Sequence, residues 1–267
     1  MSVARSLTQF RAFAHVGTTE AMAYRAEAFV WLLSGTMPLI MIAFFGAVTR
    51  DGPIGRYSTT SVVAYFLATF VVRNLTASRI SWQVNLEIRD GTLGGRLLLP
   101  VHPLVAYAAE SLGAMPVRVL GSATMALVML AVLASGSLSH DPFIWLLWSV
   151  SVVLAWLLSL FVSVTIGALA FFVDSSAKLM DAWLAGLFVF SGYLIPVDLF
   201  PPRLRAVVDW LPFRYQLGLP AELMVGAHDE LHALLLVGRQ LGFVVAGAVI
   251  TLLVWRRGLA RFAAHGG

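Results

Sequence analysis

The sequence predicts an all-α, polytopic membrane protein, because its composition and its long apolar runs both require a lipid environment. Hydrophobic residues make up 59% of the 267 positions and charged residues only 12%, whereas soluble domains carry about 25% charged residues. So few polar side chains cannot cover the surface of a soluble fold, and lipid must therefore surround much of the chain. The apolar residues form continuous runs rather than the alternating pattern of a membrane β-barrel.

Six apolar runs have the length that a membrane-spanning helix needs, which is about 20 residues. They are residues 28–48, 60–80, 104–134, 143–173, 179–199 and 233–255. Asp141-Pro142 marks the start of the fourth run, because Asp caps a helix N-terminus and Pro fits its first turn. We therefore expect residues 1–267 to form a single transmembrane domain of six helices.

The N-terminal segment, residues 1–25, is expected to form an amphipathic helix on the membrane surface. Four apolar residues recur in it at helical spacing: Val3, Leu7, Phe10 and Ala14. Such a stripe is typical of a helix that lies in the interface. A frayed tail is the alternative.

Basic residues are distributed unequally among the predicted loops. An even number of spans puts both termini on one side, and that side collects most of the arginines together with Lys178. The positive-inside rule places this side in the cytoplasm, although Arg203, Arg205 and Arg214 oppose the count. We expect a multi-pass protein of the bacterial plasma (inner) membrane with both termini cytoplasmic. The net charge of +4 is explained by this orientation rather than by nucleic-acid binding.

Residues 200–226 follow the fifth run and are expected to cap the outer face. Prolines divide this segment into short amphipathic pieces, and proline interrupts helices. The pattern predicts short surface or re-entrant helices between spans five and six. The residues assigned to this external cap are Pro196, Phe200, Pro201, Pro212 and Arg214.

Residues 81–103 form the only sizeable cytoplasmic loop between predicted spans and are expected to fold as an amphipathic elbow. One helical stripe contains Trp82, Leu86, Leu93 and Leu97, and the charged residues Glu87, Arg89 and Asp90 point elsewhere. The apolar stripe would rest on the bundle, while the charged side would dock into a groove on a soluble partner. An ordinary interfacial loop is the alternative.

The sequence lacks the motifs of an enzyme that hydrolyses ATP or binds a catalytic metal. The one lysine, Lys178, follows no glycine-rich loop, so a phosphate-binding P-loop is absent. There are no cysteines, and His228 is followed by Asp229 where the zinc-protease pattern needs glutamate. We therefore expect neither catalytic nor metal-binding residues in this chain.

Arg73 lies inside the second run, where an ionisable side chain is a functional candidate. The alternative is that its side chain reaches back to the lipid headgroups or bonds to helix carbonyls. Glu110 and Arg118 raise the same question in the third run. An Arg73–Glu110 pair is left open.

Three motifs, taken in order, resemble the short permeases of the ATP-binding-cassette type-2 family of exporters. The elbow reads Ile88-Arg89-Asp90-Gly91-Thr92-Leu93 and then Leu97-Leu98-Leu99-Pro100-Val101-His102-Pro103. The others are Tyr24-Arg25-Ala26-Glu27 and the series Ser191-Gly192, Pro196, Leu199-Phe200-Pro201, Leu211-Pro212-Phe213-Arg214-Tyr215 and Gly226. Each motif is weak alone, but their order and spacing cover nearly the whole chain. Leu99 departs from the pattern, because a basic residue is frequent there in this family.

The resemblance implies a permease subunit of an exporter that moves an amphiphilic or drug-like solute out of the cytoplasm or inner leaflet. Two permeases, as a homodimer or a paralogous heterodimer, would pair in the lipid membrane with two separate ATPase subunits. ATP and Mg²⁺ would bind to those subunits, and no cofactor would bind to this chain. The ATPase-coupling residues would be Val84, Leu86, Glu87, Ile88, Arg89, Asp90, Gly91 and Leu93.

The resemblance also implies that the second and fifth spans line the pathway at the dimer interface. The pathway candidates are Phe66, Phe70, Arg73, Phe188, Phe190 and Tyr193. Their rings could exclude water or hold apolar or cationic solutes on their faces. Plain packing is the alternative for each ring.

Two other function classes remain open. An ion-coupled secondary transporter would carry acidic residues in mid-span, and apart from Glu110 the acidic residues lie in loops or near span ends. A membrane-embedded enzyme or an assembly protein without transport would show His, Asp or Glu clustered at one depth. Co-isolation with an ATPase subunit would separate these classes.

Overall fold

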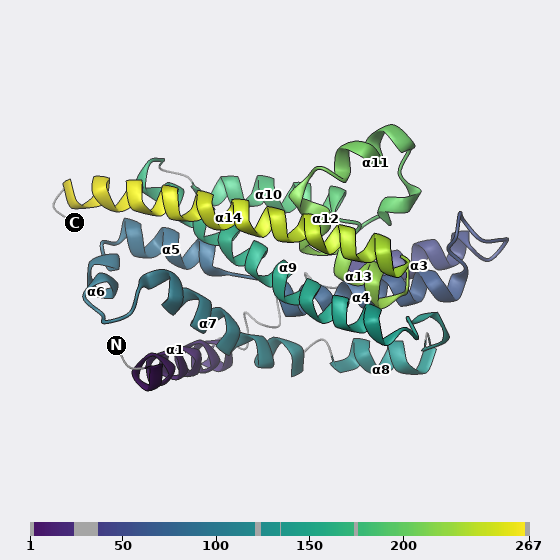
Figure 1. The fold of residues 1–267 in the computed structure, drawn as a ribbon, viewed down its shortest axis with the longest axis horizontal. Coiled ribbons are helices and arrows are strands. Elements are labelled where there is room, and N and C mark those ends of the chain that lie inside the picture. Colours follow the sequence, from purple (N-terminus) through teal and green to yellow (C-terminus); the bar gives the residue numbers. More distant parts are fainter. Residues whose placement is uncertain (1–2, 24–36, 121–123, 134, 174–175, 265–267) are drawn as a thin grey trace.

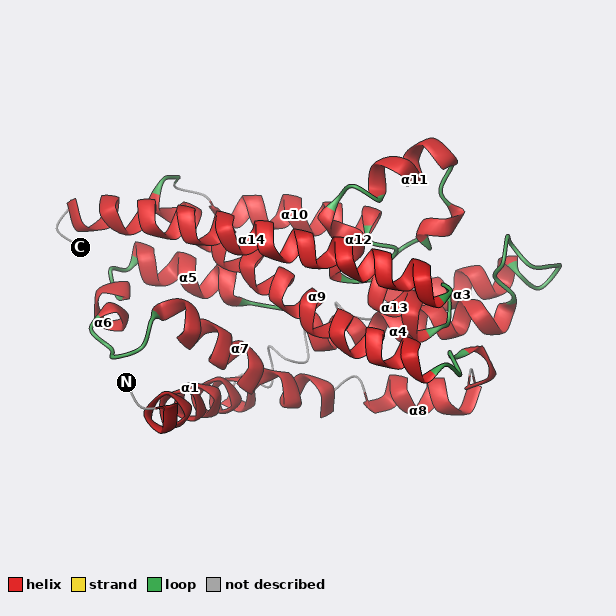
Figure 2. Ribbon diagram, viewed as in Figure 1, coloured by secondary structure: helices red, strands yellow, loops and turns green. Residues whose placement is uncertain are grey.

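The computed structural model describes residues 3–23, 37–120, 124–133, 135–173 and 176–264. These residues fold into helices joined by turns, and no β-strand occurs among them (Figure 2). The helices form an elongated bundle in which α9 (Pro142–Ala168) and α14 (Glu230–Ala264) pack against each other (Figure 1). The prediction of an all-α fold is confirmed.

Three helical segments are long and apolar enough to cross a membrane: Thr59–Arg89, Pro142–Phe171 and Glu230–Phe262. They correspond to the second, fourth and sixth predicted runs. Asp141 caps α9 as expected, because its carboxylate accepts a hydrogen bond from the Phe143 backbone N–H at 2.8 Å. The chain therefore has the helices of a multi-pass membrane protein.

The other three predicted runs differ from single long helices. Of the first run, the structure describes α3 (Met37–Val48), and residues 28–36 lie outside the described ranges. The run 104–134 contains two helices, α7 (Pro103–Arg118) and α8 (Thr124–Leu133). Pro116 lies near the end of α7, and its ring removes a backbone donor there.

The prediction that the fifth helix extends to residue 199 is wrong. This helix, α10 (Ser176–Phe190), ends nine residues earlier, and a turn at Gly192 follows it. Gly192 has φ +89°, in the left-handed region that favours glycine. The Tyr65 hydroxyl donates a hydrogen bond to the Gly192 carbonyl at 2.9 Å, and it occupies the space that a Cβ would need. This glycine therefore turns the chain out of the helix and toward the cap.

Among the three membrane-length segments, the most enclosed is the one that contains α4 (Thr59–Thr76), in which every residue from 64 to 72 is buried. It packs against α3, α8, α9 and α13 (Gly218–Met224). After a three-residue break at 77–79 the chain continues as α5 (Ile80–Arg89), which packs against α9. The elbow is therefore connected directly to the central helix.

The two ends of the bundle carry different structures (Figure 1). Both chain termini lie at the end that carries α5 and α6 (Leu93–Leu97), which we call the elbow end. The predicted cap forms the short helices α11 (Pro202–Val208), α12 (Pro212–Gln216) and α13, and α11 projects from the bundle. Termini at one end agree with an even number of spans.

The N-terminal segment forms the helix α1 (Val3–Ala23), which packs closely on α7. The Thr18 hydroxyl donates a hydrogen bond to the Gly113 carbonyl at 2.8 Å. A Cβ at Gly113 would overlap the Ala14 carbonyl, so only glycine allows the two backbones to approach this closely. The predicted helix is therefore present, and its location on the membrane surface stays a prediction.

We expect Gly113→Ala to loosen α1 from α7, because the added methyl group meets backbone atoms that cannot rotate away. Overpacking of this kind costs about 1–3 kcal/mol. Limited trypsin digestion at Arg11, together with thermal melting in detergent, measures the effect, and the variant should be cut faster and melt at a lower temperature.

The matched control is Gly242→Ala in α14, where an added methyl group has nothing within 4 Å. This change should be neutral or slightly stabilising, because alanine favours a helix more than glycine does. Equal protease resistance of the Gly113 variant and the wild type would show that α1 does not depend on this contact.

Candidate functional site

At the elbow end, one arginine joins three helices. Arg96 of α6 forms ion pairs with Glu87 of α5 at 2.7 Å and with Glu110 of α7 at 2.8 Å. The Tyr107 hydroxyl donates a hydrogen bond to Glu87 at 2.5 Å, and the Arg96 guanidinium lies 4.4 Å from the centre of the Tyr107 ring. The Gln83 amide donates to Glu110 at 2.9 Å. We call these five residues the elbow network.

The charges of the elbow network depend on one another. Burial works to lower the pKa of Arg96, but Glu110 and Glu87 outweigh it and the pKa is raised. The nearby Glu20 of α1 has a pKa raised by partial burial and by repulsion from Glu110. Two carboxylates therefore bond to one arginine, and a third, from the N-terminal helix, lies within the range of their charges.

The predicted apolar stripe of the elbow is wrong in its phase. The buried residues of α5 are Ile80, Ser81, Val84, Asn85 and Ile88. Trp82 is 63% exposed, and Glu87 does not point away from the bundle, because its carboxylate bonds to Arg96 and Tyr107. The stripe grouped Trp82 and Leu86 with Leu93 and Leu97 although Asp90-Gly91 breaks the helix between them, and the turn between α5 and α6 changes the direction of the chain.

The predicted coupling residues therefore fall into two groups. Val84, Ile88 and Leu93 are buried and fix the elbow to the bundle, Leu86 is half-buried, and Glu87 belongs to the elbow network. Arg89, Asp90 and Gly91 are exposed at the turn between α5 and α6. Of the predicted set, these three are the residues that a soluble partner could touch.

Three of the six pathway candidates lie together. The guanidinium carbon of Arg73 lies 5.0 Å from the centre of the Phe188 ring and 5.2 Å from that of Tyr193. The two rings are stacked, with centroids 5.2 Å apart and planes 20° apart. The Arg73–Glu110 pair does not form, because Glu110 bonds to Arg96 and Gln83.

The other three pathway candidates lie elsewhere. Phe66 is fully buried and packs 5.5 Å from Phe45 in the core around α4, where Phe70 is also buried. Phe190 stacks on Phe213 of the cap with centroids 6.1 Å apart. Packing in the core is therefore sufficient to account for an aromatic side chain at Phe66 and at Phe70.

At the cap end, a second buried arginine holds the short helices together. Arg214 of α12 and Glu222 of α13 are each 1% exposed and form an ion pair at 2.7 Å. Asp209 also pairs with Arg214, and His228 Nε2 lies 2.8 Å from Glu222. Burial works to raise the pKa of Glu222, but Arg214 and His228 outweigh it and hold that pKa well below its ordinary value.

The sequence analysis assigned Arg214 to the external cap without a partner, and in the structure its side chain lies buried between the short helices. Its buried partner Glu222 was not identified from the sequence, although a lone glutamate in the apolar stretch Leu219-Pro220-Ala221-Glu222-Leu223-Met224 was a detectable signal. A carboxylate in such a stretch needs a cation inside the protein. The nearest arginine or lysine along the chain was Arg214, eight residues earlier.

The other cap residues are turn and packing positions. Pro196 is buried before a short turn, and Phe200 is half-buried. Pro201 precedes α11, and Pro212 occupies the first turn of α12, where a missing backbone N–H costs nothing. The prolines therefore start the short helices of the cap.

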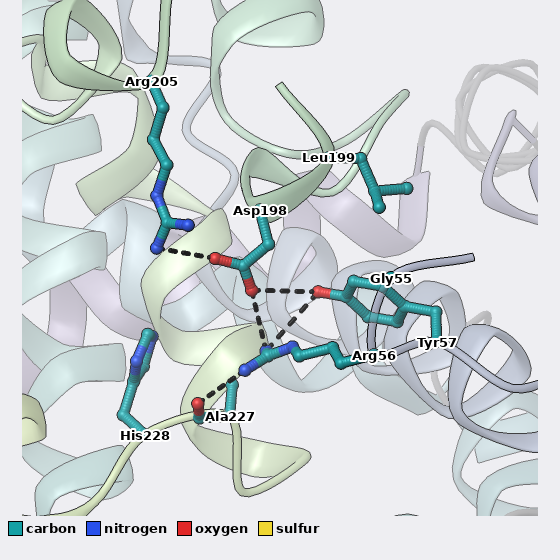
Figure 3. A pocket seen from close by; sticks show the side chains of 8 residues that line it. All are labelled: Gly55, Arg56, Tyr57, Asp198, Leu199, Arg205, Ala227 and His228. Carbon is teal, nitrogen blue, oxygen red and sulfur yellow. Dashed lines mark hydrogen bonds and ion pairs between the residues drawn. The ribbon is translucent and has the colours of Figure 1, made fainter. Parts of the chain in front are cut away.

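A pocket of about 340 Å³ lies beside the cap, and Asp198 is the carboxylate at its centre (Figure 3). Arg56 and Arg205 form ion pairs with Asp198 at 3.0 Å and 2.8 Å, and the Tyr57 hydroxyl donates to it at 3.4 Å. Arg56 also donates to the Ala227 carbonyl at 2.6 Å. We call this group the Asp198 clasp. It ties the loop between α3 and α4 to the cap, and the sequence did not predict it.

Among the described residues, no three or more His, Asp or Glu side chains are placed so that they could hold a metal ion. His228 is bonded to Glu222, and its ring lies 5.0 Å from the ring of His232. His228 therefore belongs to the buried ion pairs of the cap, and His232 packs on its ring.

The family model described as ABC-2 family transporter protein matches residues 34–266. No curated protein sequence matches the chain. The matched range contains the elbow network, the cluster around Arg73, the buried pair in the cap and the Asp198 clasp. The chain therefore belongs to the ABC-2 transporter family, as a multi-pass membrane permease.

Proposed function

We propose that this chain is the membrane subunit of an exporter that moves an amphiphilic or drug-like solute out of the cytoplasm or the inner leaflet. Its membership of the ABC-2 transporter family carries the proposal, since that family implies an ATP-binding-cassette ATPase as partner. ATP and Mg²⁺ would bind to the ATPase subunits, and the permease would bind no cofactor and catalyse no reaction. A second permease, identical or paralogous, would complete the pathway.

The proposed topology has six spans with both termini in the cytoplasm of a bacterial plasma membrane. The segments 59–89, 142–171 and 230–262 would be three of the spans. The first run with α3, the pair α7 and α8, and α10 would supply the others. The common location of both termini and the elbow at one end supports this arrangement (Figure 1).

The proposed coupling element is the exposed turn of the elbow. Arg89, Asp90 and Gly91 are exposed there, while Val84 and Ile88 anchor the same segment in the bundle. Closure of the ATPase subunits would displace this turn. Since α5 continues from α4 after a short break, and since the elbow network joins α5, α6 and α7, the displacement would reach the central helix.

The two buried acids favour this proposal over an ion-coupled transporter. Glu110 bonds to Arg96, and Glu222 bonds to Arg214. A paired arginine stabilises the ionised carboxylate, whereas a proton carrier must release and take up its proton near the ambient pH. Both acids are therefore suited to holding helices together.

Co-purification tests the proposed function. We expect the tagged permease to isolate with an ATPase subunit encoded beside it, and the complex in nanodiscs to hydrolyse ATP with vanadate sensitivity. The permease purified alone should show no hydrolysis, because it lacks a P-loop. Transport by the permease alone, driven by a proton gradient, would contradict the proposal.

Arg89→Ala tests the coupling turn. The exposed guanidinium can contact the partner without supporting the fold, so we expect the complex to assemble and hydrolyse ATP while transport falls by about tenfold, the effect of roughly 1.4 kcal/mol. The control is Arg257→Ala, because Arg257 is an exposed arginine near the C-terminal end of α14. Equal transport by both variants would remove the elbow from the coupling route.

The cap is proposed to cover the outer mouth of the pathway, and Arg214→Leu tests what holds it together. Removal of one partner from a buried ion pair costs about 3–5 kcal/mol, so thermal melting in detergent should shift downward by several degrees. Arg203→Leu is the matched control, because Arg203 is exposed on α11. A similar melting temperature for the two variants would mean that the buried pair does not stabilise the cap.

A further inference from the structure

The cluster around Arg73 contains two hydrogen-bonding groups that have no partner among the described residues. Arg73 is half-buried near the C-terminal end of α4, and its guanidinium faces the stacked rings of Phe188 and Tyr193. No hydrogen bond or ion pair joins it to the other described residues. Aromatic faces attract its charge, but they cannot fill the five N–H donors in the plane of the guanidinium.

The second group is the Tyr193 hydroxyl. Tyr193 is fully buried, and its hydroxyl has no hydrogen-bond partner among the described residues. Buried polar groups in proteins nearly always have a partner. A guanidinium and a hydroxyl from one cluster therefore both lack an acceptor within the described ranges, and a single anionic group could supply acceptors to both.

The charge at this cluster changes which solutes its rings can hold. The sequence left apolar or cationic solutes open for these ring faces. In the structure Arg73 already covers both rings, so a cationic solute would meet a like charge. A carboxylate, phosphate or sulfonate would instead meet a fork of donors that matches its geometry.

The surroundings of the cluster are suited to an apolar tail. Large hydrophobic side chains are exposed on α10 and just beyond it, namely Leu179, Val189 and Ile195. The helix that contributes Phe188 therefore also presents exposed apolar side chains. A molecule with an anionic headgroup and a hydrocarbon tail can satisfy both features at once.

We propose that Arg73, Phe188 and Tyr193 form the headgroup site for an anionic amphiphile, and this inference rests on the export function proposed above. Arg73 binds the anion through its N–H groups, and the Tyr193 hydroxyl donates a further hydrogen bond. Phe188 holds the guanidinium in position through its ring face. The site selects against cations and accepts the anionic headgroup of a transported solute or of a membrane lipid.

The test uses three single-chain probes that share a tail and differ in headgroup: hexadecyl phosphate, hexadecylphosphocholine and hexadecyltrimethylammonium. The permease–ATPase complex is reconstituted in phosphatidylcholine nanodiscs, and displacement of radiolabelled hexadecyl phosphate measures binding. ATP hydrolysis is measured in the same samples. We expect hexadecyl phosphate to bind about tenfold more tightly than the other two, as a charge-assisted hydrogen bond allows.

The variants separate the two donors. Arg73→Gln should remove the preference for the phosphate probe, and Arg73→Lys should keep part of it, since lysine retains the charge without the planar fork. Tyr193→Phe should weaken phosphate binding by roughly threefold to tenfold, as the loss of one hydrogen bond predicts. Arg203→Gln, at an exposed cap position, should bind all three probes as the wild type does.

Several results would overturn the proposal. One is equal or tighter binding of the cationic probe by the wild type, which remains decisive even if the Arg73 variants fail to fold. Another is an intact phosphate preference in Arg73→Gln.

Phosphate binding that depends on Arg73 and stimulates ATP hydrolysis identifies a transported solute. The same binding without stimulation supports a site for lipid headgroups. That result contradicts export of the probe but not the binding site.

Discussion

The fold depends on pairing buried charges inside the protein, because a bilayer offers no water to solvate them. Arg96 joins α5, α6 and α7 at the elbow end through Glu87 and Glu110. Arg214 joins α12 and α13 at the cap end through Glu222. Each of these two arginines bonds to carboxylates outside its own helix and so holds neighbouring elements together. Arg73 differs from both, because aromatic faces stand where the other two arginines have carboxylates.

Composition and local pattern were enough to predict the fold class and the main spans. The apolar runs around α4, α9 and α14 required lipid, and Asp141-Pro142 located the start of α9. The phase of α5 was misjudged because the predicted stripe joined Trp82 and Leu86 to leucines beyond the turn, and helical periodicity holds only while the helix continues; within α5 the buried face follows Ile80, Val84 and Ile88. The end of α10 could not be predicted, because the turn at Gly192 that follows it depends on a contact with Tyr65 of α4.

The candidate sites were harder to predict because their contacts are non-local. The residue types at Arg73, Phe188 and Tyr193 were recognised, but only the fold shows that Arg73 covers both rings. Asp198 and Arg56 are far apart in the sequence and meet only because the loop after α3 reaches the cap. Glu222 was overlooked because it stands in a short apolar stretch between prolines and a glycine, where no helical pattern marks a buried face.

The two ion-pair groups of the cap differ in strength, and this difference determines where the cap can move. Arg56 and Arg205 are 40% and 39% exposed in the Asp198 clasp, and exposed pairs contribute about 0–1 kcal/mol. Arg214 and Glu222 are each 1% exposed, and breaking such a pair by removing one partner costs about 3–5 kcal/mol. Opening at the clasp is therefore less costly than unfolding the buried pair. If the outer mouth opens during transport, α12 and α13 would move together as one unit, and the loop between α3 and α4 would separate from the cap at Asp198.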